Sequence, residues 1–307
     1  MTTSRNMLDV ISGVLADALV GAGFPQGVRG RQLYSVADFS GAHASAGYDT
    51  YAFLVFDIDR NSWWLRAQRA FRSEVLKSRR RMSFKNLKDR ARRRALKLFL
   101  MAAEEIDGAL IVFAIKKDHG SMFMTSPVER DDDVLNAWKP TVRERLMRIL
   151  HLGALVVAGV SKPGQDLMWI TDQDEIASND TQLTQMTSVF ARIWGNMTDH
   201  SLGHLRCGTT RSDDGDLALE DLCSIADLAA GATCELLSVM ARQRLFAVKG
   251  IVTPLRPSAF SQKTMAISNW LAERARPLKR IIIVLDADGS NGAARVTHLR
   301  LEPLPSL

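Results

Sequence analysis

The chain has few of the features that mark secreted or membrane proteins. Its three cysteines, Cys207, Cys223 and Cys234, are an odd number without Cys-x-x-Cys spacing. Neither a disulfide framework nor a thiolate zinc site is therefore expected. The longest apolar run, residues 152–160, is about half of the roughly 20 residues that a bilayer span needs. We expect a cytoplasmic protein, in a reducing compartment, with no membrane partner.

The sequence also lacks internal repeats and low-complexity linkers, so its 307 residues show no clear division into separate units. Near the N-terminus, Asp9 and Asp17 interrupt an apolar stretch at helical spacing, which a secretory signal does not tolerate. We expect a helical extension over residues 1–30, an α/β core over 31–245, and a C-terminal addition over 246–307 packed on the core.

Positive charge is concentrated in one part of the chain. Residues 60–97 contain fifteen Lys and Arg but only two acids, a net charge of +13, while the whole chain carries +6. Segregated positive charge is typical of phosphate binding, because neutralised phosphates release condensed counterions. The alternative is a solvated helix face whose long cationic side chains cover apolar surface. We predict a nucleic-acid surface with seven main contact residues: Arg79, Arg80, Arg81, Lys88, Arg92, Arg93 and Arg94.

Hydrophobic periodicity predicts an initial strand pair followed by strands that alternate with helices. The predicted strands are 33–38, 51–58, 81–85, 109–115, 167–171 and 204–209, followed by a C-terminal hairpin-like pair at 281–285 and 295–301. The predicted helices are 62–78, 84–102, 131–158, 180–194 and 217–242, with Pro140 early in the third or dividing it. The first two strands should pair antiparallel, and the continuous apolar run at 109–115 should be a buried parallel strand. This order predicts an α/β fold with a mixed sheet flanked by helices, of which the RNase H-like fold is one form.

Acidic residues follow three of the predicted core strands. Asp38, Asp118 and Asp172 stand where these strands end, and Asp227 lies inside an apolar helix. Ligands of open α/β sheets bind beyond the carboxyl ends of the strands, and carboxylates gathered there can hold Mg²⁺ or Mn²⁺. Acids after strands are also common because loops are polar, so each one alone is weak evidence. Asp174 and Glu175 are the reserve ligands, whereas Asp221 is expected to be a helix-surface acid.

The order of these motifs resembles that of a bacterial domain-of-unknown-function family, the one numbered 3800, whose members look RNase H-like. Asp38-Phe39-Ser40-Gly41 is similar to that family's Asp-Glu-Ser-Gly, and residues 226–231, Ala-Asp-Leu-Ala-Ala-Gly, are similar to its closing-helix motif. The resemblance covers about residues 30–240. It implies Asp38, Asp172 and Asp227 as metal ligands, with Lys85 and Lys117 as catalytic residues facing a phosphate.

Two departures from the family pattern bear on mechanism. Phe39 and Ser83 stand where the family usually has glutamates, which removes two potential metal ligands. We also expect the strand that ends at Lys117 and Asp118 to lie beside the first strand. In that arrangement Asp172 is too far from the first strand for shared coordination.

These observations lead to a primary hypothesis and two alternatives. The first is a divalent-metal-dependent nuclease that cleaves RNA or DNA phosphodiesters with Mg²⁺ or Mn²⁺, in bacterial antiviral defence. The second is a non-catalytic nucleic-acid-binding subunit of a larger complex, which keeps the fold and a degenerate site. The third is a hydrolase of nucleotides or small phosphates, for which the basic surface is larger than needed.

Overall fold

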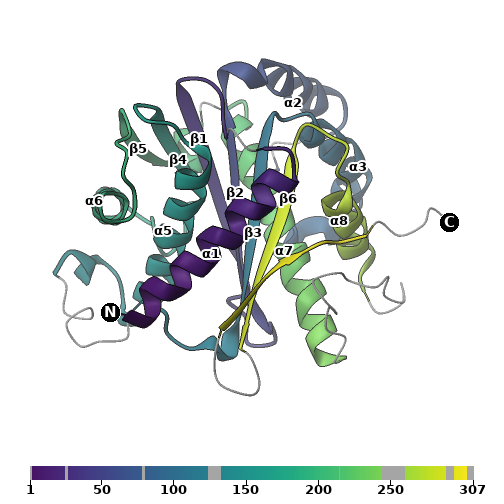
Figure 1. The fold of residues 1–307 in the computed structure, drawn as a ribbon. Helices are drawn as coiled ribbons and strands as arrows, with labels where there is room; N and C mark the ends of the chain where they lie inside the picture. Colours follow the sequence, from purple (N-terminus) through teal and green to yellow (C-terminus); the bar gives the residue numbers. More distant parts are fainter. Residues whose placement is uncertain are drawn as a thin grey trace.

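The structure is a computed structural model that describes residues 2–24, 27–77, 80–123, 133–213, 215–243, 260–287 and 294–302. Seven strands form one mixed sheet in the order β5-β4-β1-β2-β3-β6-β7, with helices on both of its faces (Figure 1). The predicted α/β fold class is therefore confirmed, and its central strand order is consistent with an RNase H-like fold.

The first five strands along the chain, which lie side by side in the order β5-β4-β1-β2-β3, explain that consistency. β1 (Gln32–Ser40), β2 (Tyr48–Asp57) and β3 (Gly108–Lys116) form an antiparallel meander. β4 (Asp166–Thr171) pairs parallel with β1, and β5 (Leu205–Thr209) pairs parallel with β4.

The expectation that the strand ending at Lys117 lies beside β1 is wrong. β2 follows β1 after a short connection and occupies one edge of β1, so that the other edge is free for β4. β3 consequently pairs with β2, antiparallel, rather than with β1.

The C-terminal strand pair extends this same sheet. β6 (Lys279–Ala287) pairs parallel with β3, and β7 (Ala294–Leu299) pairs antiparallel with β6. The predicted turn between them lies outside the described residues. The apolar run of β3 is thus buried between an antiparallel and a parallel neighbour, so the prediction of a parallel strand holds on one side only. Helix α8 (Gln262–Ala272), which precedes β6, was not predicted from the sequence.

Alternating side chains of the strands feed two hydrophobic cores. Phe53 and Val55 of β2 face a core shared with α1 (Thr2–Gly21), α5 (Pro140–Val160) and α6 (Asp180–Met197). Leu54 and Phe56 face a second core shared with α2 (Ser62–Glu74), α3 (Arg90–Glu104), α7 (Ala218–Arg242) and α8. A residue at every second position thus contributes to each core, as expected for a strand covered on both faces.

Two helix starts differ from the prediction for local reasons. Residues 81–85 form no strand; they lead into a 3₁₀ turn (Lys85–Lys88), and α3 begins only at Arg90. Asp89 caps α3 by accepting a hydrogen bond from the backbone N–H of Ala91 at 2.7 Å, which fixes its start. Pro140 is the first residue of α5, where its missing N–H costs nothing, so this helix is shorter than predicted.

Helix α7 is the one described helix that is long and apolar enough to cross a membrane. However, 89% of its apolar window is buried inside the protein, where it packs along β1 and β2. A helix buried to this extent has the position of a core helix.

Candidate carboxylate site

The fold brings together the three acids that the sequence singles out as metal ligands. Ala37 of β1 is paired with Thr171 of β4, so Asp38 and Asp172 follow at the same edge of the sheet. Asp227 comes from α7, which packs across β1. The expectation that Asp172 lies too far from β1 is wrong, because β4 is the direct neighbour of β1.

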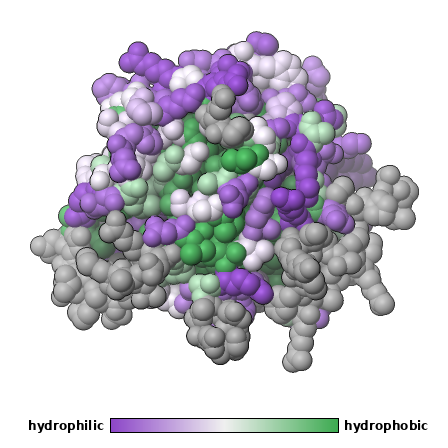
Figure 2. Space-filling view, viewed as in Figure 1, coloured by the Kyte–Doolittle hydropathy of each residue, from purple (hydrophilic) through white to green (hydrophobic). Residues whose placement is uncertain are grey.

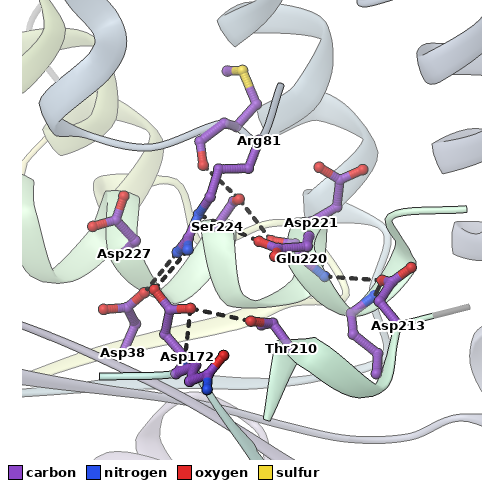
Figure 3. A network of polar contacts seen from close by, with 12 residues as sticks. Asp38, Arg81, Asp172, Thr210, Asp213, Glu220, Asp221, Ser224 and Asp227 are labelled. Atoms are coloured by element: carbon purple, nitrogen blue, oxygen red, sulfur yellow. Dashed lines mark hydrogen bonds and ion pairs between the residues drawn. The ribbon is translucent and has the colours of Figure 1, made fainter. Parts of the chain in front are cut away.

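Arg81 lies in the middle of this group. Its Nη1 donates a hydrogen bond to Oδ2 of Asp172 at 2.6 Å, and its Nη2 lies 3.5 Å from Oδ2 of Asp38. Its Nε is 3.4 Å from Oε2 of Glu220, the first acid of α7. Figure 3 shows the guanidinium reaching toward Asp38 and Asp172, with Asp227 on one side and Glu220 on the other. One cation is therefore shared by three carboxylates.

Backbone contacts hold the segment that carries Arg81 against α7. Ser224 of α7 donates a hydrogen bond to the carbonyl of Met82 at 2.6 Å. The Arg81 carbonyl accepts a bond from the Nε of Arg92 at 2.9 Å. Phe84 packs so closely on Gly231 that a Cβ there would collide with the ring. These contacts place the Arg81 backbone beside the carboxylates.

Asp227 has a different partner. Its Oδ2 accepts a hydrogen bond from the backbone N–H of Phe84 at 2.6 Å. The Phe84 carbonyl in turn accepts from Nζ of Lys263 on α8 at 3.2 Å, and this ammonium lies 3.7 Å from the Phe84 ring centroid. The C-terminal addition thus contributes a cation at the edge of the site.

The electrostatics of the site are unbalanced. Burial raises the pKa of Asp38 well above its usual range, and the negative charge of Asp227 raises it further. Burial also raises the pKa of Asp227, against the effect of its bond from the Phe84 N–H. Four carboxylates, counting Glu220, surround the single guanidinium of Arg81. Buried like charges are costly unless they are paired, so the cluster is able to accept further positive charge.

The carboxylate oxygens of this site are the type of ligand that suits a divalent metal. Mg²⁺ and Mn²⁺ prefer carboxylate oxygens, and the Oδ2 atoms of Asp38 and Asp172 already converge on one cation. Among the described residues, however, no group of three or more acidic, His or Cys side chains is arranged to hold a metal as the site stands. Arg81 lies between the ligands, so a metal would enter only where this side chain moves away.

Other acids near the start of α7 have structural roles. Asp221 is fully buried, contrary to the expectation of a surface acid, and it forms an ion pair with Arg72 of α2. Asp213 accepts hydrogen bonds from the backbone N–H groups of Leu217 and Leu219 and thereby fixes the start of α7. These acids are paired within the protein and leave the carboxylates around Arg81 as the candidate site.

Several residues that the sequence proposed for the site lie elsewhere. Nζ of Lys117 donates to the carbonyl of His43 at 2.8 Å and lies 3.9 Å from Asp49. Asp118 forms an ion pair with Lys116 at 2.7 Å. Lys85 differs from these two, because it follows Phe84, whose backbone N–H bonds to Asp227; its side chain is exposed on the 3₁₀ turn.

The two reserve ligands also have partners of their own. Oδ1 of Asp174 accepts from the backbone N–H of Ile176 at 2.9 Å, and Glu175 pairs with Arg145. Neither needs a metal to satisfy its carboxylate.

Four of the seven residues predicted for the basic surface are exposed. Lys88, Arg93 and Arg94 are exposed, and Arg80 is exposed beside Asp89, at 3.5 Å. Arg92 is buried, because its guanidinium holds the Arg81 carbonyl and Asp89; Arg79 lies outside the described residues. In Figure 2, hydrophilic side chains are spread along the upper part of the molecule, which includes the place of α2 in Figure 1. Lys88, which ends the 3₁₀ turn before α3, and Arg93 and Arg94 of α3 are together called the α3 basic face below.

Two tryptophans that are neighbours in the sequence, Trp63 and Trp64, differ in burial. Trp64 is buried against the core, as expected for a residue that packs α2 on the sheet, but Trp63 is 50% exposed. An exposed aromatic side chain of this kind is able to stack on an unpaired base.

Sequence reasoning missed part of the site. It assigned Arg81 to the nucleic-acid surface, and no local pattern marks it as the partner of Asp38 and Asp172. Glu220 had a usable signal, because it precedes Asp227 by seven residues, two turns of the same helix. Lys263 belongs to a helix that was not predicted.

Two comparisons with known proteins complete the description of the site. No model of a protein family matches the chain, and a search of curated proteins finds no match to it.

Proposed function

We propose that the protein is a divalent-metal-dependent nuclease that cleaves RNA or DNA phosphodiesters in the bacterial cytoplasm, as part of antiviral defence. We further propose that it belongs to the domain-of-unknown-function family 3800 that its motifs resemble. The observation that carries the activity is that carboxylate oxygens of Asp38 and Asp172 converge on one cation, with Asp227 close enough to raise the pKa of Asp38.

In this proposal Asp38, Asp172 and Asp227 hold Mg²⁺ or Mn²⁺. Metals at such a site activate the attacking water and stabilise the leaving oxygen of a phosphodiester. Thr210 keeps Asp172 oriented by donating a hydrogen bond to its Oδ1 at 3.1 Å. Phe84 does the same for Asp227 through its backbone N–H.

The α3 basic face supplies the binding energy for the polymer backbone. Helix α3 starts beside the site, because Arg92 links its first turn to the Arg81 carbonyl. On the exposed side of this helix, lysine would bind a phosphate as a point charge and arginine through two parallel N–H groups. Such binding is independent of sequence and sensitive to salt. A surface of this size favours a polymer over a free nucleotide.

The structure also favours a second candidate, a non-catalytic nucleic-acid-binding subunit of a larger complex. Arg81 already occupies the cation position, and Phe39 and Ser83 stand where the resembled family has glutamates. A site that permanently keeps its arginine binds nucleic acid without cutting it.

Incubation with labelled RNA and DNA separates these two candidates. The purified protein and its Asp38→Asn variant are tested with Mn²⁺, with Mg²⁺ and with a chelator. The nuclease predicts cleavage that is lost on chelation and at least about a hundredfold slower in the variant. Asp118→Asn is the matched control, because Asp118 also follows a strand but pairs with Lys116, and it should cleave as the wild type does. Salt-sensitive binding without cleavage under every condition supports the non-catalytic subunit instead.

A further inference from the structure

The guanidinium of Arg81 is partly buried, but its contacts with the surrounding carboxylates are uneven. Its side chain is 28% exposed, so one side of it faces solvent. Its contact with Asp172 is short, at 2.6 Å, whereas its contact with Asp38 is 3.5 Å. Its Nε makes no hydrogen bond, although it lies 3.4 Å from Glu220. The guanidinium therefore satisfies one carboxylate well and the other two poorly.

A guanidinium and a metal cannot use these oxygens at the same time. Mg²⁺ binds carboxylate oxygens at about 2.0–2.1 Å in a near-octahedral shell. The Oδ1 atoms of Asp38 and Asp172 already accept hydrogen bonds from within the protein, so the Oδ2 atoms would be left for a metal, and these are the atoms that Arg81 now contacts. Two cations at such short range also repel each other strongly in a partly buried site.

The charge balance favours the exchange of one cation for the other. Arg81 brings one positive charge to a group of four carboxylates, because its guanidinium contacts Asp38, Asp172 and Glu220 and Asp227 lies beside them. A divalent ion neutralises more of this charge than the guanidinium does. The anchors of the Arg81 segment, Ser224 and Arg92, hold the backbone rather than the guanidinium. The side chain is therefore able to leave while its backbone stays in place.

We propose that Arg81 is a built-in competitor of divalent metal, whose guanidinium must leave Asp38 and Asp172 before a metal ion binds there. The inference rests on the proposed function, since it takes these carboxylates as the metal ligands. The wild-type protein then binds metal more weakly than its ligand set permits, because part of the binding energy is used to displace Arg81. Arg81 thus sets the metal concentration at which the site fills.

Calorimetric titration with Mn²⁺ alone tests the competition without any measurement of activity. We expect Arg81→Gln to bind Mn²⁺ at least about tenfold more tightly than the wild type, which corresponds to about 1.4 kcal/mol. The matched control is Arg80→Gln, which removes the same charge from the adjacent, 69% exposed side chain and should leave the affinity within about twofold. The gain should disappear in the double variant Arg81→Gln/Asp172→Asn.

Equal Mn²⁺ affinity in the wild type and Arg81→Gln would overturn the competition but leave the metal site standing. No Mn²⁺ binding in either protein would overturn both the competition and the metal-dependent function. If Arg81→Gln does not fold, Arg81→Lys takes its place, because a lysine cannot contact two carboxylates as a fork; it should also bind Mn²⁺ more tightly. In the wild type, nuclear magnetic resonance should show the Arg81 Nε–H signal shifting as Mg²⁺ is added, and a signal that stays fixed while Mg²⁺ binds would contradict the displacement.

Discussion

Two arginines reach the first turns of α7, and they are held in opposite ways. Arg72 meets Asp221 one to one: the guanidinium is only 10% exposed, the carboxylate is fully buried, and Gln68 adds a hydrogen bond at 2.8 Å. Arg81 is shared among Asp38, Asp172 and Glu220. After burial, the largest influence on the pKa of Asp221 is the hydrogen bond from Arg72, which lowers it. The largest influence on the pKa of Asp38 after burial is the negative charge of Asp227, which raises it. The cluster of Arg72 and Asp221 is therefore complete, because its charges are balanced within the protein. The cluster around Arg81 is incomplete, because its carboxylates outnumber its cation.

The largest effect is expected from breaking the complete pair. Arg72→Met should lower the free energy of unfolding by about 3–5 kcal/mol, because it leaves the buried carboxylate of Asp221 without its cation. Denaturant unfolding followed by circular dichroism measures this change. Arg69→Met is the control, since that neighbouring side chain is 67% exposed and lies 3.6 Å from Asp216; it should cost less than about 1 kcal/mol. An equally small loss for Arg72→Met would mean that the two clusters do not differ in kind.

A smaller effect, of opposite sign, is expected in the incomplete cluster. The folded-state pKa of Asp38 lies above its unfolded value, so the folded protein binds more protons between these two values and loses stability as the pH rises through them. Asp38→Asn removes the charge that causes this loss. The variant should therefore be more stable than the wild type at pH 7, by about 1 kcal/mol or more, with the difference shrinking toward pH 4.

Thermal unfolding at a series of pH values, without added metal, measures this difference. Asp118→Asn is again the control, because the Asp118 carboxylate is 55% exposed beside Lys116. An Asp38→Asn variant that is less stable than the wild type at pH 7 would show that Arg81 balances the cluster after all.

The smallest effect on folding is expected from the α3 basic face, which touches neither cluster. The double variant Arg93→Gln/Arg94→Gln should keep the stability of the wild type. It should bind oligonucleotides more weakly, with the salt dependence of binding reduced by about two counterions. Fluorescence anisotropy at several salt concentrations measures this slope. An unchanged slope would remove α3 from the interface, and Lys162→Gln is a control on the far side of the sheet, after α5.

The comparison also shows what the sequence could and could not predict. Asp38 and Asp172 were found because a strand end places a residue at a defined edge of the sheet, whichever strands pair. Asp118 follows β3, which runs parallel to β1 with β2 between them, so it is about 10 Å further along the edge. Strand ends were thus predictable, but the neighbours of each strand were not.

Partners that are distant in the sequence carry no local signal. Arg72 and Asp221 are 149 residues apart, and Arg81 and Asp172 are 91 apart. Their charges read as a solvated helix and a polar loop when they are taken one at a time. The segment 81–85 was predicted as a strand, but the Asp89 cap and the contact between Phe84 and Gly231 determine its path instead. The cap is a local signal that the prediction did not use, whereas the contact between Phe84 and Gly231 exists only in the assembled fold.

The pairing of β3 with β6 has a consequence for the synthesis of the protein. Every residue from Ala109 to Ile115 is buried, yet the strand that covers one edge of β3 begins only at Lys279. While the ribosome makes the intervening residues, this apolar strand has an open edge that is able to pair with another chain. Contacts between segments so far apart also form slowly. The nascent chain is therefore exposed to aggregation from the time β3 leaves the ribosome until β6 has followed it.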